Sequence, residues 1–281
     1  MKTIIPNPEN LERLKAQIKK TGYQSLHILS DLDRTLTYGT VDGVKTPSII
    51  STIRDDNHLV AGYAKKAHAL FDKYNLIEVD PNIPLAEKKR AMQEWWEIHN
   101  ELLIESGLSK SDLEDIVKND RVKFREGVPE FLDFLCENNI PLIVFSSSVC
   151  GDAIPLFFQK IERNYPNIFY ITNKFNWDDN GKAISTKEPI IHCMNKDGVI
   201  LEDIPEIREI IKDRRNIILL GDSIGDLGMI EGFDYSNLLT VGFLNLDYNG
   251  SSKEAYEENF DVILEGDGDF NFVNTLIRDL G

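Results

Sequence analysis

Cysteine is scarce in this sequence, and its placement does not suggest a metal site. The three cysteines are Cys136, Cys150 and Cys193, an odd number with no CxxC pair. This pattern argues against a disulfide framework and against a zinc site, and it fits a reducing compartment.

Positive charge is also under-represented. The 31 lysines and arginines are outnumbered by 47 aspartates and glutamates, which gives a formal net charge of −16. We therefore expect no nucleic-acid polymer and no anionic membrane as partner, because both attract cationic surfaces. An acidic protein needs a cation to hold an anionic substrate, although plain solubility explains most of this charge.

Long apolar segments are absent as well. No apolar run approaches the roughly 20 residues that a membrane-spanning helix needs. The first residues, from Met1 to Pro6, do not resemble the apolar core of a signal peptide. We expect a cytoplasmic protein and favour a monomer, although the sequence does not determine the oligomeric state.

What is present from residue 125 onward is an alternation of strand-like and helix-like segments. The apolar runs are Pro141–Phe145, Ile168–Thr172, Ile217–Leu220, Leu239–Phe243 and Val262–Leu264, and helical patterns cover 129–137, 152–163, 203–213, 253–259 and 269–280. This alternation is typical of an α/β fold with a mainly parallel sheet. Asp179-Asn180-Gly181 predicts a turn in a small antiparallel excursion near 169–186.

Residues 59–120 have a different texture, in which apolar residues recur at helical spacing. The two series are Val60, Ala64, Ala67 and Phe71, and Met92, Trp95, His99 and Leu102. A capping-box pattern at Ser111–Glu114 predicts a third helix, and Ile77–Val79 is expected to be a short strand. We predict a helical cap domain at 45–121, inserted into a core made of 1–44 and 122–281.

An acidic pair follows the first buried strand. Leu26–Leu29 is a short apolar run, and the sequence Ser30-Asp31-Leu32-Asp33 follows it. Two carboxylates this close repel each other and are costly to desolvate, so a metal cation or a proton must relieve them. The pair suits phosphoryl transfer, in which one carboxylate attacks phosphorus and the other protonates the leaving oxygen. The alternative is an ordinary acidic turn.

Three further polar groups follow the later strands. Ser146-Ser147-Ser148 offers hydroxyl and backbone N–H groups for phosphate oxygens. Asp222 and Asp226 lie in a glycine-containing turn and could bind the same cation from a second side. Lys187 could neutralise a transferring phosphoryl group. Each group alone is common turn or surface material, but together they predict a Mg²⁺ and phosphate site at the carboxyl ends of the strands.

The order of these groups resembles the haloacid-dehalogenase-like phosphatase superfamily. The resemblance implies that Asp31 is the nucleophile, Asp33 the acid and base, and Lys187 the lysine of the third motif. It implies phosphate contacts from Thr35, Ser146 and Ser147, and a Mg²⁺ ion bound by Asp31, the Asp33 backbone carbonyl and Asp222, with Asp226 binding through water or orienting Lys187.

Longer strings resemble the cytosolic 5′-nucleotidase III, or pyrimidine 5′-nucleotidase, family from about Asp31 to the C-terminus. They are Ile77–Pro81, Glu94–Trp96, Arg125–Gly127, Ile190–His192 with Asn195–Lys196, and Ile217–Ser223. The resemblance implies a Rossmann-like core with a helical cap. It also implies removal of phosphate from nucleoside 5′-monophosphates, of pyrimidine or 7-methylguanosine type.

The same resemblance implies that Glu78 contacts the base and that Trp96 stacks on it. His99 falls where the family often has a small hydroxyl residue, so a ligand role and a helix-packing role both stay open. The Ser146–Gly151 segment is one residue longer than the family's Ser-Ala-Gly motif. The base preference is therefore not determined.

Other functions remain open at this stage. The chain could hydrolyse another small phosphomonoester, such as a sugar phosphate. It could bind nucleotides without catalysis, although binding alone does not require an acid at Asp33. It could also transfer the phosphoryl group to a nucleoside instead of water.

Overall fold

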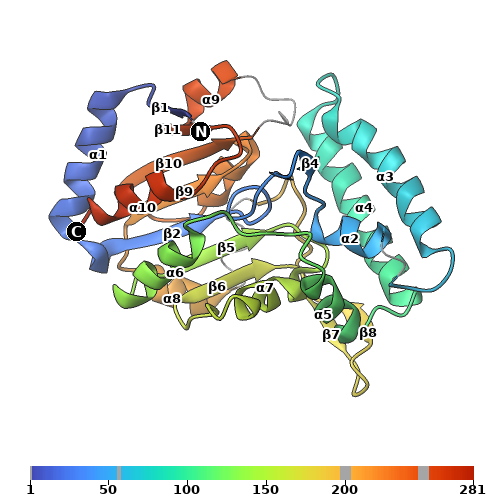
Figure 1. Ribbon diagram of the computed structural model, residues 1–281. Helices are drawn as coiled ribbons and strands as arrows, with labels where there is room; N and C mark the ends of the chain where they lie inside the picture. Colours follow the sequence, from blue (N-terminus) through green and yellow to red (C-terminus); the bar gives the residue numbers. More distant parts are fainter. Residues whose placement is uncertain (1, 56–57, 197–203, 246–252) are drawn as a thin grey trace.

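The computed structural model describes residues 2–55, 58–196, 204–245 and 253–281. The main strands are β1 (Lys2–Ile4), β2 (Leu26–Ser30), β5 (Leu142–Ser146), β6 (Ile168–Thr172), β9 (Asn216–Gly221), β10 (Asn237–Leu244) and β11 (Val262–Glu265). They form a central sheet in the order β1-β11-β10-β9-β2-β5-β6 (Figure 1). All neighbours are parallel except β1, which runs antiparallel to β11. The predicted α/β fold with a mainly parallel sheet is confirmed.

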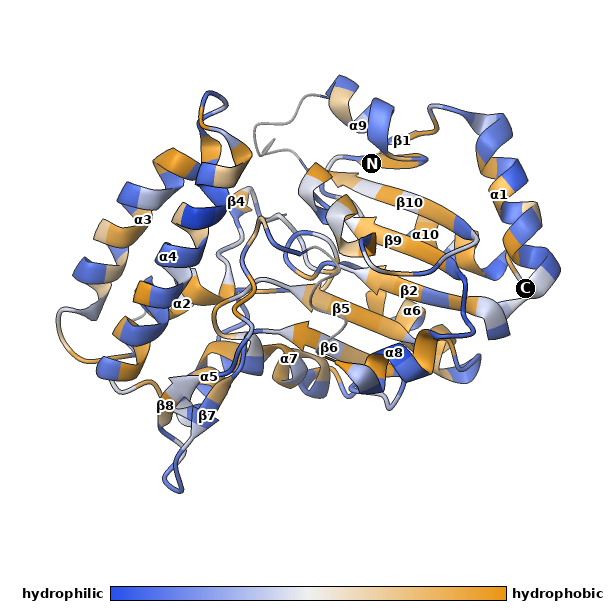
Figure 2. Cartoon of the chain, turned by 180° about the vertical axis from the view of Figure 1, so that it is seen from behind, coloured by the Kyte–Doolittle hydropathy of each residue, from blue (hydrophilic) through white to orange (hydrophobic). Residues whose placement is uncertain are grey.

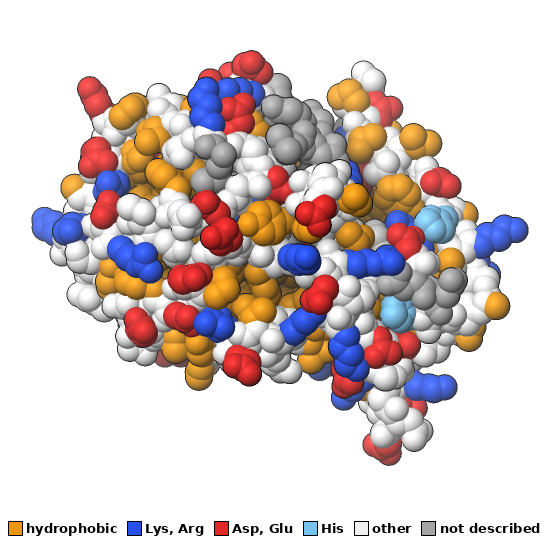
Figure 3. All heavy atoms as spheres, viewed as in Figure 1, with side chains coloured by type: hydrophobic (Ala, Val, Ile, Leu, Met, Phe, Trp, Pro, Cys, Tyr) orange, Lys and Arg blue, Asp and Glu red, His pale blue; other side chains and the backbone are white. Residues whose placement is uncertain are grey.

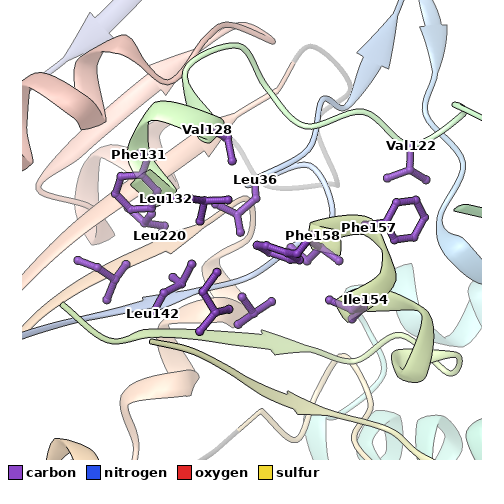
Figure 4. Packing of buried hydrophobic residues seen from close by; sticks show 14 of the residues in the cluster. Leu36, Val122, Val128, Phe131, Leu132, Leu142, Ile154, Phe157, Phe158 and Leu220 are labelled. Carbon is purple, nitrogen blue, oxygen red and sulfur yellow. The ribbon is translucent and has the colours of Figure 1, made fainter. Parts of the chain in front are cut away.

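Helices cover both faces of this sheet. One face carries α1 (Pro8–Thr21), α6 (Val128–Glu137), α7 (Ile154–Lys160) and α10 (Asn271–Arg278), and the other carries α8 (Pro205–Ile211), α9 (Lys253–Asn259) and the 3₁₀ helix η4 (Ile224–Ile230). Strand side chains alternate between the faces, so Leu220 packs with the first set and Leu219 with the second. Figure 4 shows Phe131 of α6 and Phe158 of α7 packed on the first face, near Leu142 and Leu220.

A group of helices lies beside the sheet, at the end toward which β2 and β5 point (Figure 1). It consists of α2 (Ile49–Asp55), α3 (Tyr63–Val79), α4 (Leu85–Glu105) and α5 (Lys110–Lys118). The surfaces of α3 and α4 mix polar and apolar residues, whereas the central strands are apolar (Figure 2). These helices lie within 45–121. The division of the chain into a cap and a core at those boundaries stays a prediction.

A hairpin that follows the main strand β6 in the sequence packs against these helices. It is made of β7 (Phe175–Trp177) and β8 (Ala183–Thr186), which pair antiparallel as the predicted excursion requires. The Lys110 N–H donates to the Gly181 carbonyl at 2.9 Å, and the Ala183 N–H donates to the Leu108 carbonyl at 2.9 Å. The remaining short elements are β3 (Thr40–Val41), β4 (Val44–Lys45) and the 3₁₀ helices η1 (Tyr23–Ser25) and η2 (Gly151–Ala153).

Two local predictions were wrong. Ile77–Val79 is the last turn of α3 rather than a strand, because α3 packs along α4 with Tyr74 stacked on Trp95 at 5.7 Å between ring centroids. Tertiary packing here outweighs the strand preference of isoleucine and valine. The cap of α5 is Ser109, two positions before the predicted Ser111, and it forms a capping box with Asp112. In the ranges described, no helix combines the length and the apolar character needed to cross a bilayer.

Candidate active site

The carboxyl ends of β2 and β9 bring three acids together. These strands are adjacent and parallel, so Asp31 after β2 lies beside Asp222 after β9. The Asp31 N–H donates to the Leu220 carbonyl at 3.0 Å, which continues the strand pairing to the acid itself. One carboxylate oxygen each of Asp31, Asp222 and Asp226 lies within 4.8 Å of the others. The predicted convergence of these acids is therefore present in the structure.

The turn after β9 holds Asp226 in a defined orientation. Its Oδ2 accepts a hydrogen bond from the Ser223 N–H at 3.0 Å, as part of a capping box at the start of η4. Gly221 makes room for this carboxylate, because a Cβ at position 221 would lie 2.6 Å from the Asp226 Cβ. The glycine therefore matters for close approach, and Oδ1 of Asp226 is directed away from the turn, toward the Lys196 ammonium.

Lys196 lies between these carboxylates. Its Nζ donates to Oδ1 of Asp31 in a short hydrogen bond and to Oδ1 of Asp226 at 2.9 Å. The Lys196 side chain is 6% exposed. Burial alone would lower its pKa, but attraction to Asp226 and Asp31 outweighs burial and raises the pKa. Lys196 is therefore a fixed positive charge beside Asp31.

The placement of Lys187 at this site was wrong. Lys187 is exposed at the end of β8, and its backbone N–H donates to the Lys174 carbonyl at 2.8 Å. With Lys174 and Glu188 it lines a separate surface cavity of about 370 Å³. Motif order alone could not tell which lysine in this stretch is buried. The available signal was the Asn195–Lys196 string, which carried the family resemblance without being given a role.

The acidic cluster is short of positive charge. Burial raises the pKa of Asp31, and repulsion from Asp226 and Asp33 raises it further, while Lys196 lowers it. Burial likewise raises the pKa of Asp222, assisted by Asp226 and Asp31. Four carboxylates, those of Asp31, Asp33, Asp222 and Asp226, face the positive charges of Lys196 and Arg34, which leaves an excess of negative charge. An oxygen-only donor set with this charge fits a hard divalent cation such as Mg²⁺.

The loop after Asp31 carries the second acid and a buried hydroxyl. Burial raises the pKa of Asp33, whereas the positive charges of Arg34 and Lys196 lower it. Oγ1 of Thr35 is buried and has no hydrogen-bond partner among the described residues. An unpaired buried hydroxyl two residues after Asp33 is suited to an oxygen of a bound ligand.

The serine loop after β5 is held by α4 and by the segment that follows β6. Ser146 is 1% exposed, and its Oγ accepts from the Ser148 N–H at 3.2 Å. The Ser147 carbonyl accepts from the Trp96 indole N–H at 2.9 Å and from the Asn173 side-chain amide at 3.2 Å. Asn173 also donates to the Ile191 carbonyl at 2.7 Å. It thereby links the serine loop to the segment that leads to Lys196, a connection that the sequence reasoning did not identify.

The three residues assigned to the base lie in different surroundings. Glu78, at the end of α3, is close enough to Cys193 to raise the pKa of that thiol, which burial raises most. The Trp96 ring is 6.2 Å from the His192 ring, so both Glu78 and Trp96 face the segment that carries Lys196. His99 is 4% exposed between α3 and α4, with its Nε2 at 3.1 Å from the Tyr63 hydroxyl. This is a helix-packing arrangement.

The buried imidazole of His99 predicts a pH-dependent stability. Burial lowers its pKa from 6.5 to about 4, so the unfolded chain binds a proton at a higher pH than the folded protein does. Its stabilising contribution is complete above pH 6.5 and is lost as the pH falls toward about 4. In urea unfolding, we expect the stability advantage of wild type over His99→Gln to shrink by about 2 kcal/mol from pH 7 to pH 4.5.

His68→Gln is the matched control for that measurement, because the His68 side chain is 52% exposed. Its stability difference from wild type should change far less over the same pH interval. A difference between wild type and His99→Gln that does not change with pH would contradict the prediction.

Comparison with known proteins identifies the family. The sequence pattern of the pyrimidine 5′-nucleotidase (UMPH-1) family matches residues 34–281. The chain belongs to this family. It is 34% identical over 276 residues to the 7-methylguanosine phosphate-specific 5′-nucleotidase of Gallus gallus, covering 98% of this chain and 94% of that protein. A Xenopus laevis relative of the same name, form A, is 32% identical and covers 97% and 93%.

Solved structures agree with this family assignment. Cytosolic 5′-nucleotidase IIIB (cN-IIIB) bound to cytidine superposes with a TM-score of 0.90 at 28% identity, over 99% of this chain and 93% of that chain. A phospho-aspartyl intermediate analogue of phosphoserine phosphatase superposes with a TM-score of 0.50 at 19% identity, over 89% and 97%. This second likeness concerns the fold alone, and it agrees with the predicted haloacid-dehalogenase-like architecture.

Proposed function

We propose that this protein hydrolyses nucleoside 5′-monophosphates, of pyrimidine or 7-methylguanosine type, to a nucleoside and phosphate. The observation that carries the proposal is the buried contact of Asp31 with Lys196, beside Asp222 and Asp226. A carboxylate next to a fixed cation and a cation-binding cluster is suited to attack on a phosphate dianion. The family and the names of the relatives support the nucleotide as substrate.

The chain's own side chains supply the steps. Asp31 attacks phosphorus, so that a carboxylate oxygen–phosphorus bond forms while the bond to the nucleoside 5′-oxygen breaks. Asp33 gives its proton to that leaving oxygen and then takes one from the water that cleaves the acyl phosphate. Its raised pKa favours the protonated form that the first step needs. Lys196 neutralises charge that develops on the phosphoryl oxygens.

A Mg²⁺ ion fits this donor set, and Asp31, Asp222 and the Asp33 backbone carbonyl are the proposed ligands. When bound, the ion would supply Lewis-acid stabilisation of the phosphoryl group. Asp226 has both carboxylate oxygens engaged, by Lys196 and by the Ser223 N–H. Its proposed role is therefore to hold Lys196. Thr35 and Ser146, with Ser147, are the proposed phosphate contacts.

Trp96 and Glu78 are the proposed contacts for the base. The Trp96 indole is oriented by its hydrogen bond to the Ser147 carbonyl, and a large aromatic face stacks well on a base, best on a cationic methylated one.

Acidic and basic side chains are intermixed on the face shown in Figure 3, which suits a small anionic substrate better than a polyanion. A cytoplasmic location is also proposed, since a Caenorhabditis elegans relative is named putative cytosolic 5′-nucleotidase 3.

The decisive experiment measures inorganic phosphate released from a panel of substrates with Mg²⁺. We expect turnover of CMP, UMP or 7-methylguanosine monophosphate to exceed that of sugar phosphates. Faster turnover of a sugar phosphate would favour another phosphomonoester as substrate. Binding of CMP without phosphate release would indicate a catalytically silent protein, and added nucleoside acceptors would reveal phosphoryl transfer.

Mg²⁺ is expected to stabilise the folded protein, because it relieves the repulsion among buried carboxylates. At a concentration of 100 times its Kd, the free energy of unfolding should rise by about 3 kcal/mol. Urea unfolding with and without MgCl₂ measures the effect. Asp222→Asn should abolish most of it, whereas Asp234→Asn, at a side chain that is 91% exposed, should keep it. Equal stabilisation of the two variants would contradict the proposed metal site.

A further inference from the structure

A buried arginine spans the underside of the loop that carries Asp33. Arg125 is completely buried, and its guanidinium donates to two successive backbone carbonyls of that loop. Its Nε lies 2.8 Å from the Thr35 carbonyl oxygen, and its Nη2 lies 2.5 Å from that of Arg34. A planar guanidinium can bridge two carbonyls in a geometry that a lysine ammonium cannot reproduce.

The clamped loop contains an uncommon backbone conformation. Arg34 has a φ of 63°, in the left-handed region that residues with a Cβ rarely adopt. Its carbonyl is held twice, by Arg125 and by the Asn245 side-chain amide at 3.0 Å. Its N–H donates to Oγ1 of Thr37 at 2.9 Å. A strained backbone conformation persists only when several surrounding contacts hold it in place. The hydrogen bonds of the Arg34 carbonyl and N–H hold this one.

The other end of the clamp is anchored in the segments that follow β10 and β11. Arg125 Nη1 donates to Oδ1 of Asp267 at 2.8 Å, and Nη2 donates to Oδ1 of Asn245 at 2.7 Å. The Asp267 carboxylate also accepts from the Gly39 N–H at 2.9 Å. The loop after β2 is therefore fixed to a side of the sheet from which no proposed catalytic group comes.

We propose that Arg125 is a positioning residue for the general acid. The direction of the Asp33–Arg34 peptide relative to the Arg34 carbonyl depends on the φ and ψ angles of Arg34. These angles are held because Arg125 binds the carbonyl while Oγ1 of Thr37 accepts from the N–H. Arg125 thereby holds the Asp33 carboxyl toward the site while remaining on the buried side of the loop. The inference rests on the proposed function, since it assigns Arg125 a part in the same reaction.

The test is a double-mutant cycle on phosphate release from CMP, or from the best nucleotide of the panel. Asp33→Asn should lower kcat by about 10³-fold, and Arg125→Lys by about 10²-fold, through loss of general-acid catalysis. If Arg125 acts through Asp33, the double variant should be no slower than Asp33→Asn alone. A purely structural role gives losses that multiply, so multiplied losses would overturn the inference, as would an unchanged kcat in Arg125→Lys.

Arg214→Lys is the matched control. Arg214 also donates to backbone carbonyls, those of Tyr23, Leu26 and Asn139, but at the opposite end of the sheet. It should lower stability without lowering kcat. If Arg125→Lys does not fold, Asn245→Ala takes its place in the cycle, because it removes the other donor to the Arg34 carbonyl. A double variant no slower than Asp33→Asn supports the inference, and losses that multiply overturn it. A wild type that releases no phosphate from any nucleotide overturns the proposed function, whereas multiplied losses in an active enzyme overturn only the role of Arg125.

Discussion

Asp31→Asn is expected to reduce phosphate release at least about 10⁴-fold, because an amide cannot act as the nucleophile. The substitution keeps the size of the side chain, so the fold of the loop after β2 should be preserved. Initial rates with the best nucleotide of the panel, at saturating Mg²⁺, measure the effect. Wild type is incubated with nucleotide that is radiolabelled at phosphorus, and the reaction is quenched with acid. The label should be trapped on the wild-type protein and not on Asp31→Asn.

The matched control is Asp234→Asn, which makes the same chemical change at an exposed site and should leave the rate within about 2-fold of wild type. Turnover by Asp31→Asn equal to that of wild type would disprove the nucleophile assignment. Label trapped on the Asp31→Asn protein would place the covalent intermediate on another residue.

Lys196→Met is expected to lower kcat by about 10³-fold. The substitution removes the positive charge that stabilises the negative charge developing on the phosphoryl oxygens. The same substitution leaves the carboxylates of Asp31 and Asp226 buried without their shared partner. Breaking a buried ion pair on one side costs about 3–5 kcal/mol, so Mg²⁺-free urea unfolding should detect a large loss of stability. Added Mg²⁺ should restore part of the stability but not the rate.

Lys187→Met provides the comparison, because Lys187 is the lysine that motif order alone selected. It is exposed and lies at a separate surface cavity, so its removal should change kcat by less than about 2-fold and stability by less than about 0.5 kcal/mol. A larger loss of kcat in Lys187→Met than in Lys196→Met would reverse the assignment of the catalytic lysine.

The parts of the site that follow strand ends could be predicted from local patterns. Asp31 and Asp222 each lie two positions after an apolar run, and parallel strands place their carboxyl ends at one edge of the sheet. Ser146 follows the same rule on the other side of β2. Their convergence required only strand recognition and a parallel topology, both of which leave a clear signal in the order of apolar residues.

The groups that support the site could not be predicted in this way. Lys196, Arg125 and Asn173 act through long-range contacts, such as the link from Arg125 to Asp267 across 142 positions. A lysine or asparagine in a loop carries no local sign of being buried. His99 shows the same limit, because helical spacing predicted its inward direction but could not say whether it meets a ligand or Tyr63.

The α/β class, the order of the chemical groups and the family follow from the amino-acid sequence, since apolar periodicity and short motifs are local properties of the chain. The lysine that faces Asp31, the contacts that hold Arg34 in its left-handed conformation and the position of the β7–β8 hairpin are visible in the folded molecule alone. These depend on which distant segments come into contact. That outcome is set by the packing of the whole molecule rather than by any one stretch of residues.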